Sequence, residues 1–67
     1  MDSLKLKAAM VIAGKNSADM AKLCNISPGS WFNKTQGKTE FTVEEANNIK
    51  AVLNLNKDQL IDIFFTD

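Results

Sequence analysis

Residues 17–36 read SADMAKLCNISPGSWFNKTQ, and this stretch decides the fold class. Asn16 or Ser17 is suited to cap a helix at its start, because a short polar side chain can accept hydrogen bonds from first-turn amides. Asn25 tolerates a left-handed backbone and can end that helix where glycine is absent. The pattern predicts a short helix between these points.

A second helix is predicted directly after the first. Ser27 is a strong N-cap, and Pro28 follows at the position where a missing N–H is no loss. Gly37 ends this helix. Only residues 25–27 separate the two helices, so together they have the anatomy of a helix-turn-helix.

The rest of the chain predicts three further helices and no strand. Asp2 or Ser3 can cap a first helix that Gly14 ends. Thr42 and Glu45 form a capping box, with Phe41 placed to staple onto Ala46, and Asn56 with Gln59 repeats the box. No stretch alternates apolar and polar residues over the length of a strand. The sequence therefore predicts one all-α domain of five helices over residues 1–67, and its initial Met and its ending favour a whole small protein.

Apolar residues at helical spacing predict the core. The expected inward positions are Leu6, Met10, Ala13, Met20, Ala21, Cys24, Ile26, Trp31, Ala46, Ile49, Val52, Leu53, Leu60, Ile63 and Phe64. Phe64 and Phe65 are adjacent and cannot face the same way on a helix. One of them is expected to close the core, and the other to lie on the surface as a contact for a dimer or a partner.

Composition excludes several classes of function. The chain has 67 residues, no His and one Cys, so imidazole-based catalysis, an internal disulfide and a Cys/His zinc site lack their residues. No nucleophile–base pair or phosphate-binding glycine loop is present, so we expect no enzyme, cofactor or metal. The longest apolar run, residues 8–13, is far shorter than a membrane helix needs. We expect a cytoplasmic protein without a membrane partner.

Charge is divided unevenly along the chain. Its formal net charge is zero, but residues 1–38 hold six lysines and two carboxylates, whereas residues 39–67 hold two lysines and six carboxylates. A basic N-terminal half fits a module that offers this half to a polyanion. Chance asymmetry in a small domain remains an equal alternative at this point.

The chain resembles the small phage repressor and Cro-like helix-turn-helix domains of the XRE family. Residues 20–27, MAKLCNIS, are similar to the family segment Leu-Ala-x-x-Leu-Gly-Val-Ser. Gly37 and Lys38 resemble the glycine after the recognition helix, and residues 52–60 resemble the turn into the last helix. The resemblance covers nearly the whole chain. It implies a five-helix lambda-repressor-like fold and a phage-type transcriptional regulator that binds operator DNA.

The chain departs from the family pattern at informative places. Many relatives pair a buried Arg in the first helix with a Glu that closes the recognition helix. The matching positions here are Met10 and Thr35, so this ion pair is expected to be absent. Pro28 and Gly29 stand where relatives often carry Gln, Arg or Ser. The chain has no Arg at all, which removes the commonest guanine contact.

The resemblance implies a set of DNA-binding positions. Asn33 and Gln36 can each bond adenine, and Phe32 can touch a thymine methyl. The N-terminus of the helix at Ser17 suits a phosphate, and Lys34 is a further phosphate candidate. The expected DNA-binding residues are Ser17, Ser27, Pro28, Gly29, Ser30, Phe32, Asn33, Gln36, Lys38 and Thr39.

Two functions remain open from the sequence. In the first, the chain is a regulator, as a monomer or as a homodimer on a two-fold operator, whose partner is double-stranded DNA. In the alternative, it is a phage antirepressor or modulator that uses the same fold to bind a repressor protein. The zero net charge, the missing Arg, the Pro28–Gly29 start and the predicted exposure of Phe32 favour the alternative.

Overall fold

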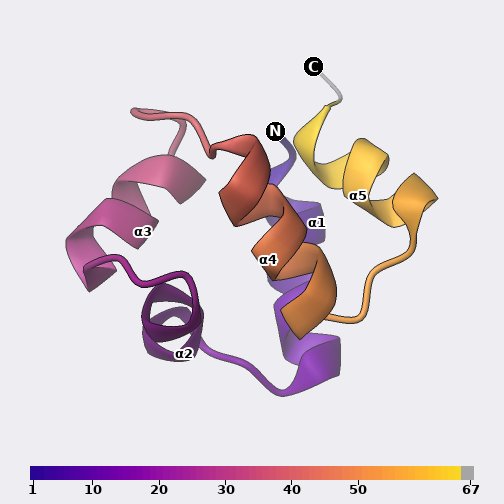
Figure 1. The fold of residues 1–67 in the computed structure, drawn as a ribbon, viewed down its shortest axis with the longest axis horizontal. Coiled ribbons are helices and arrows are strands. Elements are labelled where there is room, and N and C mark those ends of the chain that lie inside the picture. The colour runs from indigo at the N-terminus through magenta and orange to yellow at the C-terminus, as the bar shows by residue number, and fades with distance from the viewer. Residues whose placement is uncertain (66–67) are drawn as a thin grey trace.

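Each helix begins at a polar residue whose side chain accepts hydrogen bonds from first-turn amides. The computed structural model describes residues 1–65, which form five helices and no strand (Figure 1). The helices are α1 (Ser3–Ala13), α2 (Ser17–Leu23), α3 (Pro28–Thr35), α4 (Val43–Val52) and α5 (Lys57–Phe64). Their caps are Asp2, Asn16, Ser27, Thr42 and Asn56. The all-α prediction is confirmed for these residues, and the end of the predicted domain, residues 66–67, lies outside them.

Positive backbone φ angles occur at the three helix ends where the sequence predicts them, with φ angles of 70° at Gly14, 58° at Asn25 and 79° at Gly37. Asn54, after α4, also has a positive φ angle, of 54°. One boundary differs from the prediction. Helix α2 ends at Leu23, so four residues, 24–27, separate it from α3 instead of three. The Cys24 amide still bonds the Met20 carbonyl at 2.9 Å, which keeps Cys24 on the inward side.

The core lies where α1, α4 and α5 meet the α2–α3 pair. Helix α2 packs against both α3 and α4, and α5 packs against α1 and α4 (Figure 1). The amide of Asp2 donates to the Ile63 carbonyl at 2.7 Å and so ties the N-terminus to α5. The buried cluster consists of Leu6, Met10, Met20, Ala21, Cys24, Trp31, Ile49, Leu53, Leu55 and Ile63. Only Leu55 was missing from the predicted core, because it follows the turn at Asn54 and belongs to no helix pattern.

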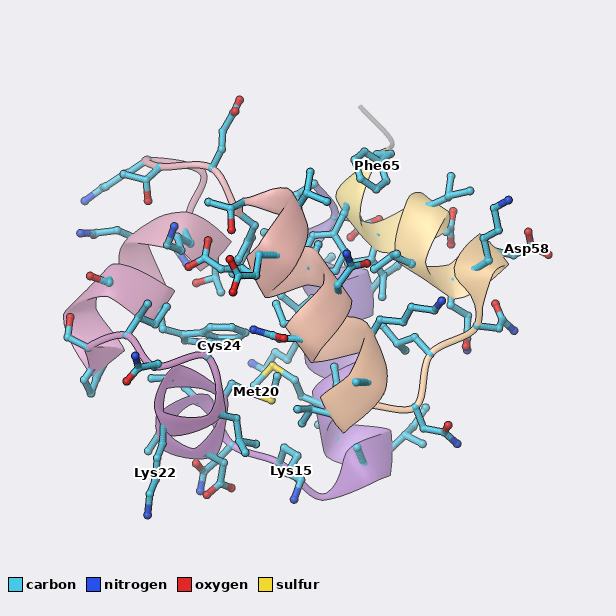
Figure 2. All side chains as sticks on the ribbon, in the orientation of Figure 1. Lys15, Met20, Lys22, Cys24, Asp58 and Phe65 are labelled. Carbon is cyan, nitrogen blue, oxygen red and sulfur yellow. The ribbon has the colours of Figure 1, made fainter. Side chains whose placement is uncertain are left out.

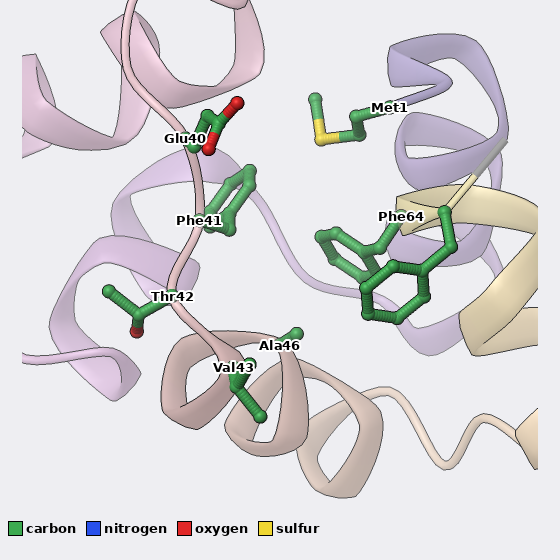
Figure 3. Close-up of a pocket in the computed structure, with 8 residues that line it drawn as sticks. Met1, Glu40, Phe41, Thr42, Val43, Ala46 and Phe64 are labelled. Carbon is green, nitrogen blue, oxygen red and sulfur yellow. The ribbon is translucent and has the colours of Figure 1, made fainter. Parts of the chain in front are cut away.

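Three aromatic rings close the end of the core next to Met1 and the end of α5. Phe41 stands edge-on to Trp31 and to Phe64, with 5.4 Å between ring centroids in both pairs. Phe41 and Phe64 also line a hollow of about 290 Å³ that Met1 enters from the N-terminus (Figure 3). Phe65, beside Phe64, is exposed. The prediction that one of these two residues packs inward and the other remains on the surface is confirmed.

None of the helices within residues 1–65 is both long and apolar enough to cross a lipid bilayer.

Candidate nucleic-acid interface

The two helices of the predicted helix-turn-helix pack directly on each other. Met20 and Ala21 of α2 and Trp31 of α3 are buried, with 2% or less of each residue exposed. The Ile26 amide donates to the Ala21 carbonyl at 3.0 Å and closes the turn around Asn25. Figure 2 shows Met20 and Cys24 pointing toward the centre of the molecule, whereas Lys22 points away from it. Burial of one side fixes which side of the pair faces solvent.

The outward side of α3 carries most of the predicted DNA-binding residues. Gly29, Asn33 and Gln36 follow one another at spacings of four and three, which places them on one helix face. Phe32 lies beside this face, and 56% of it is exposed. The residues of α3 and its cap that are exposed are Ser27, Pro28, Gly29, Ser30, Phe32, Asn33 and Gln36. Trp31 alone is buried, as the sequence predicted.

In the first turn of α3, some polar groups form the helix cap and others face solvent. The Ser27 hydroxyl accepts from the Ser30 amide at 3.1 Å and donates to the Ser30 hydroxyl at 3.1 Å. The Ser27 carbonyl accepts from the Trp31 amide. Pro28 has no amide proton, so the Gly29 amide is the first-turn donor left for an external acceptor. Ser30 keeps its own hydroxyl proton to donate, whereas Ser27 is used as the cap.

A groove of about 370 Å³ joins α3 to α1 and to the start of α2. Phe32 and Gln36 line it together with Ser17, and Leu4 and Lys7 of α1 line its other side. The groove brings together two predicted residues that are 19 positions apart, Ser17 and Gln36. Lys7 was missed as a candidate ligand for phosphate. No local pattern marks it, because its place beside α3 depends on how α1 packs.

The start of α2 is a weaker phosphate site than the sequence predicts. Asn16, and not Ser17, is the cap, and Asp19 completes a capping box with it. The Asp19 carboxylate accepts from the Asn16 amide at 3.1 Å. A carboxylate already occupies the positive end of the short helix dipole and repels a phosphate there. Ser17 is exposed, and its hydroxyl is a neutral donor beside this carboxylate.

Lys34 was predicted to contact phosphate, and the structure places it elsewhere. Its ammonium donates to the Glu45 carboxylate at 2.9 Å and to the Glu40 carbonyl at 3.0 Å. The side chains of Lys34 and Glu45 are only 15% and 13% exposed. The ammonium also lies 5.7 Å from the centre of the Phe41 ring. Lys34 therefore joins α3 to α4, and its ammonium is paired inside the molecule instead of being presented on the outward side of α3.

The loop after α3 keeps two predicted residues on the surface. The Lys38 amide donates to the Asn33 carbonyl at 3.0 Å, which folds the loop back over the end of α3. Lys38 and Thr39 are both exposed. Lys38 thus lies at the same end of α3 as Gln36.

Two lysines of the basic half form ion pairs with carboxylates of the same chain. Lys5 pairs with Asp62 at 2.7 Å, and Lys34 pairs with Glu45 at 2.9 Å. Each pair joins a lysine of the basic half to a carboxylate of the acidic half. The hydrogen bond that the Lys5 ammonium donates to the Asp62 carboxylate raises the pKa of Lys5. Lys7, Lys15, Lys22 and Lys38 are the other lysines of the basic half, and they supply the charge that an external polyanion would meet.

Cys24 is part of the core and not a reactive group. Its burial raises the pKa of the thiol, and the nearby Glu45 carboxylate adds to this effect against the opposing effect of Lys34. The thiol is therefore protonated at neutral pH and packs as a small apolar side chain, as the sequence predicted.

No protein-family model, curated protein sequence or solved structure matches this chain.

Proposed function

We propose that this chain is a phage-type transcriptional regulator with the lambda-repressor-like helix-turn-helix fold, which binds operator DNA through α2 and α3. The observation that carries the proposal is the division of α3 into a buried side at Trp31 and an outward side at Gly29, Asn33 and Gln36. A recognition helix needs this division, because its inward side fixes it to the domain while its outward side enters the major groove. A protein that binds operator DNA of this type would act in the cytoplasm.

The outward residues divide into base contacts and backbone contacts. Asn33 and Gln36 carry carboxamides that can bond adenine at two atoms. The Gly29 amide and the hydroxyls of Ser17 and Ser30 are neutral donors suited to phosphate. Lys7 and Lys38 lie at the two borders of this surface, on α1 and in the loop after α3, and supply its positive charge. A homodimer on a two-fold operator would present this surface twice.

An amide-shift NMR titration with a mixed-sequence DNA duplex tests the proposal. We expect shifts at Ser17, Gly29, Asn33 and Lys38 at low salt. These shifts should fade as salt is added, because binding releases cations from the DNA and a higher salt concentration opposes that release. If Lys38 contacts one phosphate, Lys38→Ala reduces the slope of log affinity against log salt by about 0.9. Once an operator is found, Asn33→Ala is expected to weaken binding at one base position by about 1–3 kcal/mol.

Lys57→Ala is the control for Lys38→Ala. Lys57 is an exposed lysine at the start of α5, outside the surface that α2 and α3 form. Its removal changes the net charge equally and should leave the salt slope unchanged. A titration without any shift at low salt would rule out DNA binding by this surface.

The second candidate is an antirepressor or modulator that binds a repressor protein with the same surface. Exposed Phe32 favours it, because Phe32 lies in one groove with Leu4, of which 78% is exposed. Two large apolar side chains at the centre of a surface are typical of a protein contact. The neutral charge of the chain adds to this argument.

Phe32→Ala separates the two candidates. An aromatic anchor at the centre of a protein interface is worth at least about 2 kcal/mol, or a loss of about 30-fold in affinity. A single thymine-methyl contact is worth less. With a phage repressor as the titrant, a large loss of affinity supports the protein partner, and an unchanged affinity excludes Phe32 from the interface. Asn33→Ala is the matched variant one position away.

A further inference from the structure

The loop between α3 and α4, residues 36–42, has few hydrogen bonds of its own. Its first part folds against the end of α3, where the Gly37 amide donates to the Lys34 carbonyl at 3.2 Å and the Lys38 amide donates to the Asn33 carbonyl at 3.0 Å. Beyond Lys38, no amide of residues 39–41 donates a hydrogen bond to another residue of the described chain, 1–65. The conformation of this middle part therefore depends on contacts with other elements.

The side chain of Lys34 supplies the contact nearest to this middle part. Its ammonium donates to the backbone carbonyl of Glu40 at 3.0 Å and to the carboxylate of Glu45 at 2.9 Å. The same oxygen of Glu45 accepts from the Thr42 amide at 2.8 Å. The side chains of Lys34 and Glu45 are only 15% and 13% exposed, so water competes little for these bonds. Lys34 thus holds the backbone of the loop from inside the molecule.

This bond constrains a part of the loop that the aromatic contacts do not. Phe41 stands edge-on to Trp31 and to Phe64, which fixes its ring in the core. A ring contact leaves the peptide group between Glu40 and Phe41 free to rotate, whereas a hydrogen bond to the Glu40 carbonyl fixes the plane of that group. An apolar side chain in place of Lys34 would fill the same space but has no donor for this carbonyl.

The residues just before this peptide group are the exposed residues of the loop. Lys38 and Thr39 lie two positions and one position before Glu40 and face solvent. We propose that Lys34 is a positioning residue for DNA binding, which holds the loop in the conformation that presents Lys38 and Thr39 to a phosphate. This inference rests on the proposed function. A loose loop would have to be ordered on binding, and ordering one residue lowers affinity by roughly 5- to 30-fold.

Amide relaxation of the protein without DNA tests the positioning role. In the wild type we expect order parameters of about 0.85 at residues 38–40, the value of a rigid backbone, and in Lys34→Met we expect values below about 0.6. Asn54 and Leu55, in the loop between α4 and α5, should keep their order in both proteins, because the Leu55 amide donates to the Lys50 carbonyl at 2.9 Å. A general loss of stability would not loosen one loop alone.

Glu45→Gln is the matched control for the loss of the ion pair. It removes the charge, but Lys34 can still donate to the Glu40 carbonyl, and the new carboxamide oxygen can still accept from the Thr42 amide. Residues 38–40 should therefore stay ordered in this variant. Lys34→Met leaves the carboxylate of Glu45 unpaired, which endangers folding. If it does not fold, the double variant Lys34→Met, Glu45→Gln removes that charge, and its loop is compared with the loop of Glu45→Gln.

Titration with a mixed-sequence DNA duplex at low salt relates the loop to binding. Lys34→Met should bind at least about fivefold more weakly than Lys57→Ala, which removes the same charge far from the loop. Its salt slope should equal that of the wild type, because Lys38 still makes its phosphate contact once the loop is ordered. Glu45→Gln, which keeps the bond to the loop, should show no such loss.

The two measurements separate the failure of this inference from the failure of the proposed function. Order parameters below about 0.6 at residues 38–40 of the wild type overturn the inference, as does a loop that stays ordered in Lys34→Met or loosens equally in Glu45→Gln. A loosened loop with unchanged affinity also overturns it. So does a reduced salt slope for Lys34→Met, which would make Lys34 itself a phosphate ligand. A wild type with an ordered loop that binds no DNA overturns the proposed function, and the role of the loop in binding with it.

Discussion

We expect Trp31→Ala to remove a large share of the stability of the protein. Trp31 is 2% exposed and is among the largest fully buried side chains of the core. Its ring stands edge-on to Phe41, which stands edge-on to Phe64, so one truncation disrupts the contact of α3 with the loop before α4. Replacing a buried tryptophan with alanine costs about 3–5 kcal/mol. The total stability of a chain of this length is about 3–10 kcal/mol.

The neighbouring residue provides the control for this prediction. Phe32→Ala removes an aromatic ring of similar kind, but more than half of Phe32 is exposed, so the loss in stability should be below about 1 kcal/mol. Urea unfolding followed by far-ultraviolet circular dichroism measures both variants without using tryptophan fluorescence. Equal stability of the two variants would contradict the orientation of α3, and with it the outward position of Asn33 and Gln36.

Most of the local structure could be predicted from the sequence because its causes are local. A cap acts within three or four residues, as Thr42 does with Glu45 and Asn56 does with Gln59. Gly14 and Asn25 end helices through their own backbone preference. Periodic apolar residues gave nearly all of the core for the same reason. Such local features can be predicted from a single sequence without an alignment.

The features that were missed depend on contacts between distant residues. Lys34 and Glu45 meet across the loop between α3 and α4, although the sequence predicted Lys34 at the DNA backbone. Lys7 lines the same groove as Gln36 only because the fold brings α1 to that groove. Met10 and Thr35 stand at the positions where many proteins of the resembled family carry a buried Arg–Glu ion pair, so the sequence predicts that this pair is absent. The structure has a different one, between neighbouring parts of α3 and α4.

The Lys34–Glu45 pair is expected to make the stability of the protein depend on pH below about 4.5. Burial acts to raise the pKa of Glu45, but the Thr42 amide and the Lys34 ammonium favour the carboxylate, so its pKa is lowered from 4.5. A lowered pKa in the folded state means that unfolding takes up a proton in this range. The stabilisation is present above the pKa of the unfolded chain and is lost as pH falls through the pKa of the folded state.

Glu45→Gln isolates this effect. The variant cannot form the ion pair, so it should be less stable than the wild type at neutral pH, by about 1–3 kcal/mol for a charged hydrogen bond. The difference should shrink as pH falls below 4.5, because the wild type then loses the same charge. Glu44→Gln removes a charge from the same helix turn at an exposed position and controls for the helix dipole. A difference that stays constant down to low pH would contradict the pair.

Lys34→Met extends the same argument to the proposed DNA-binding surface. Methionine keeps most of the stem that packs near Phe41 but removes the ammonium, so this variant should lose about 1–3 kcal/mol of stability. It should lose little further stability when combined with Glu45→Gln, because both changes break one interaction. Where the variant is still folded, its DNA-binding salt slope should match the wild type, since its ammonium faces Glu45. Lys38→Ala should do the opposite, with stability unchanged and the slope reduced. A reduced slope for Lys34→Met would mean that the ion pair opens when DNA binds.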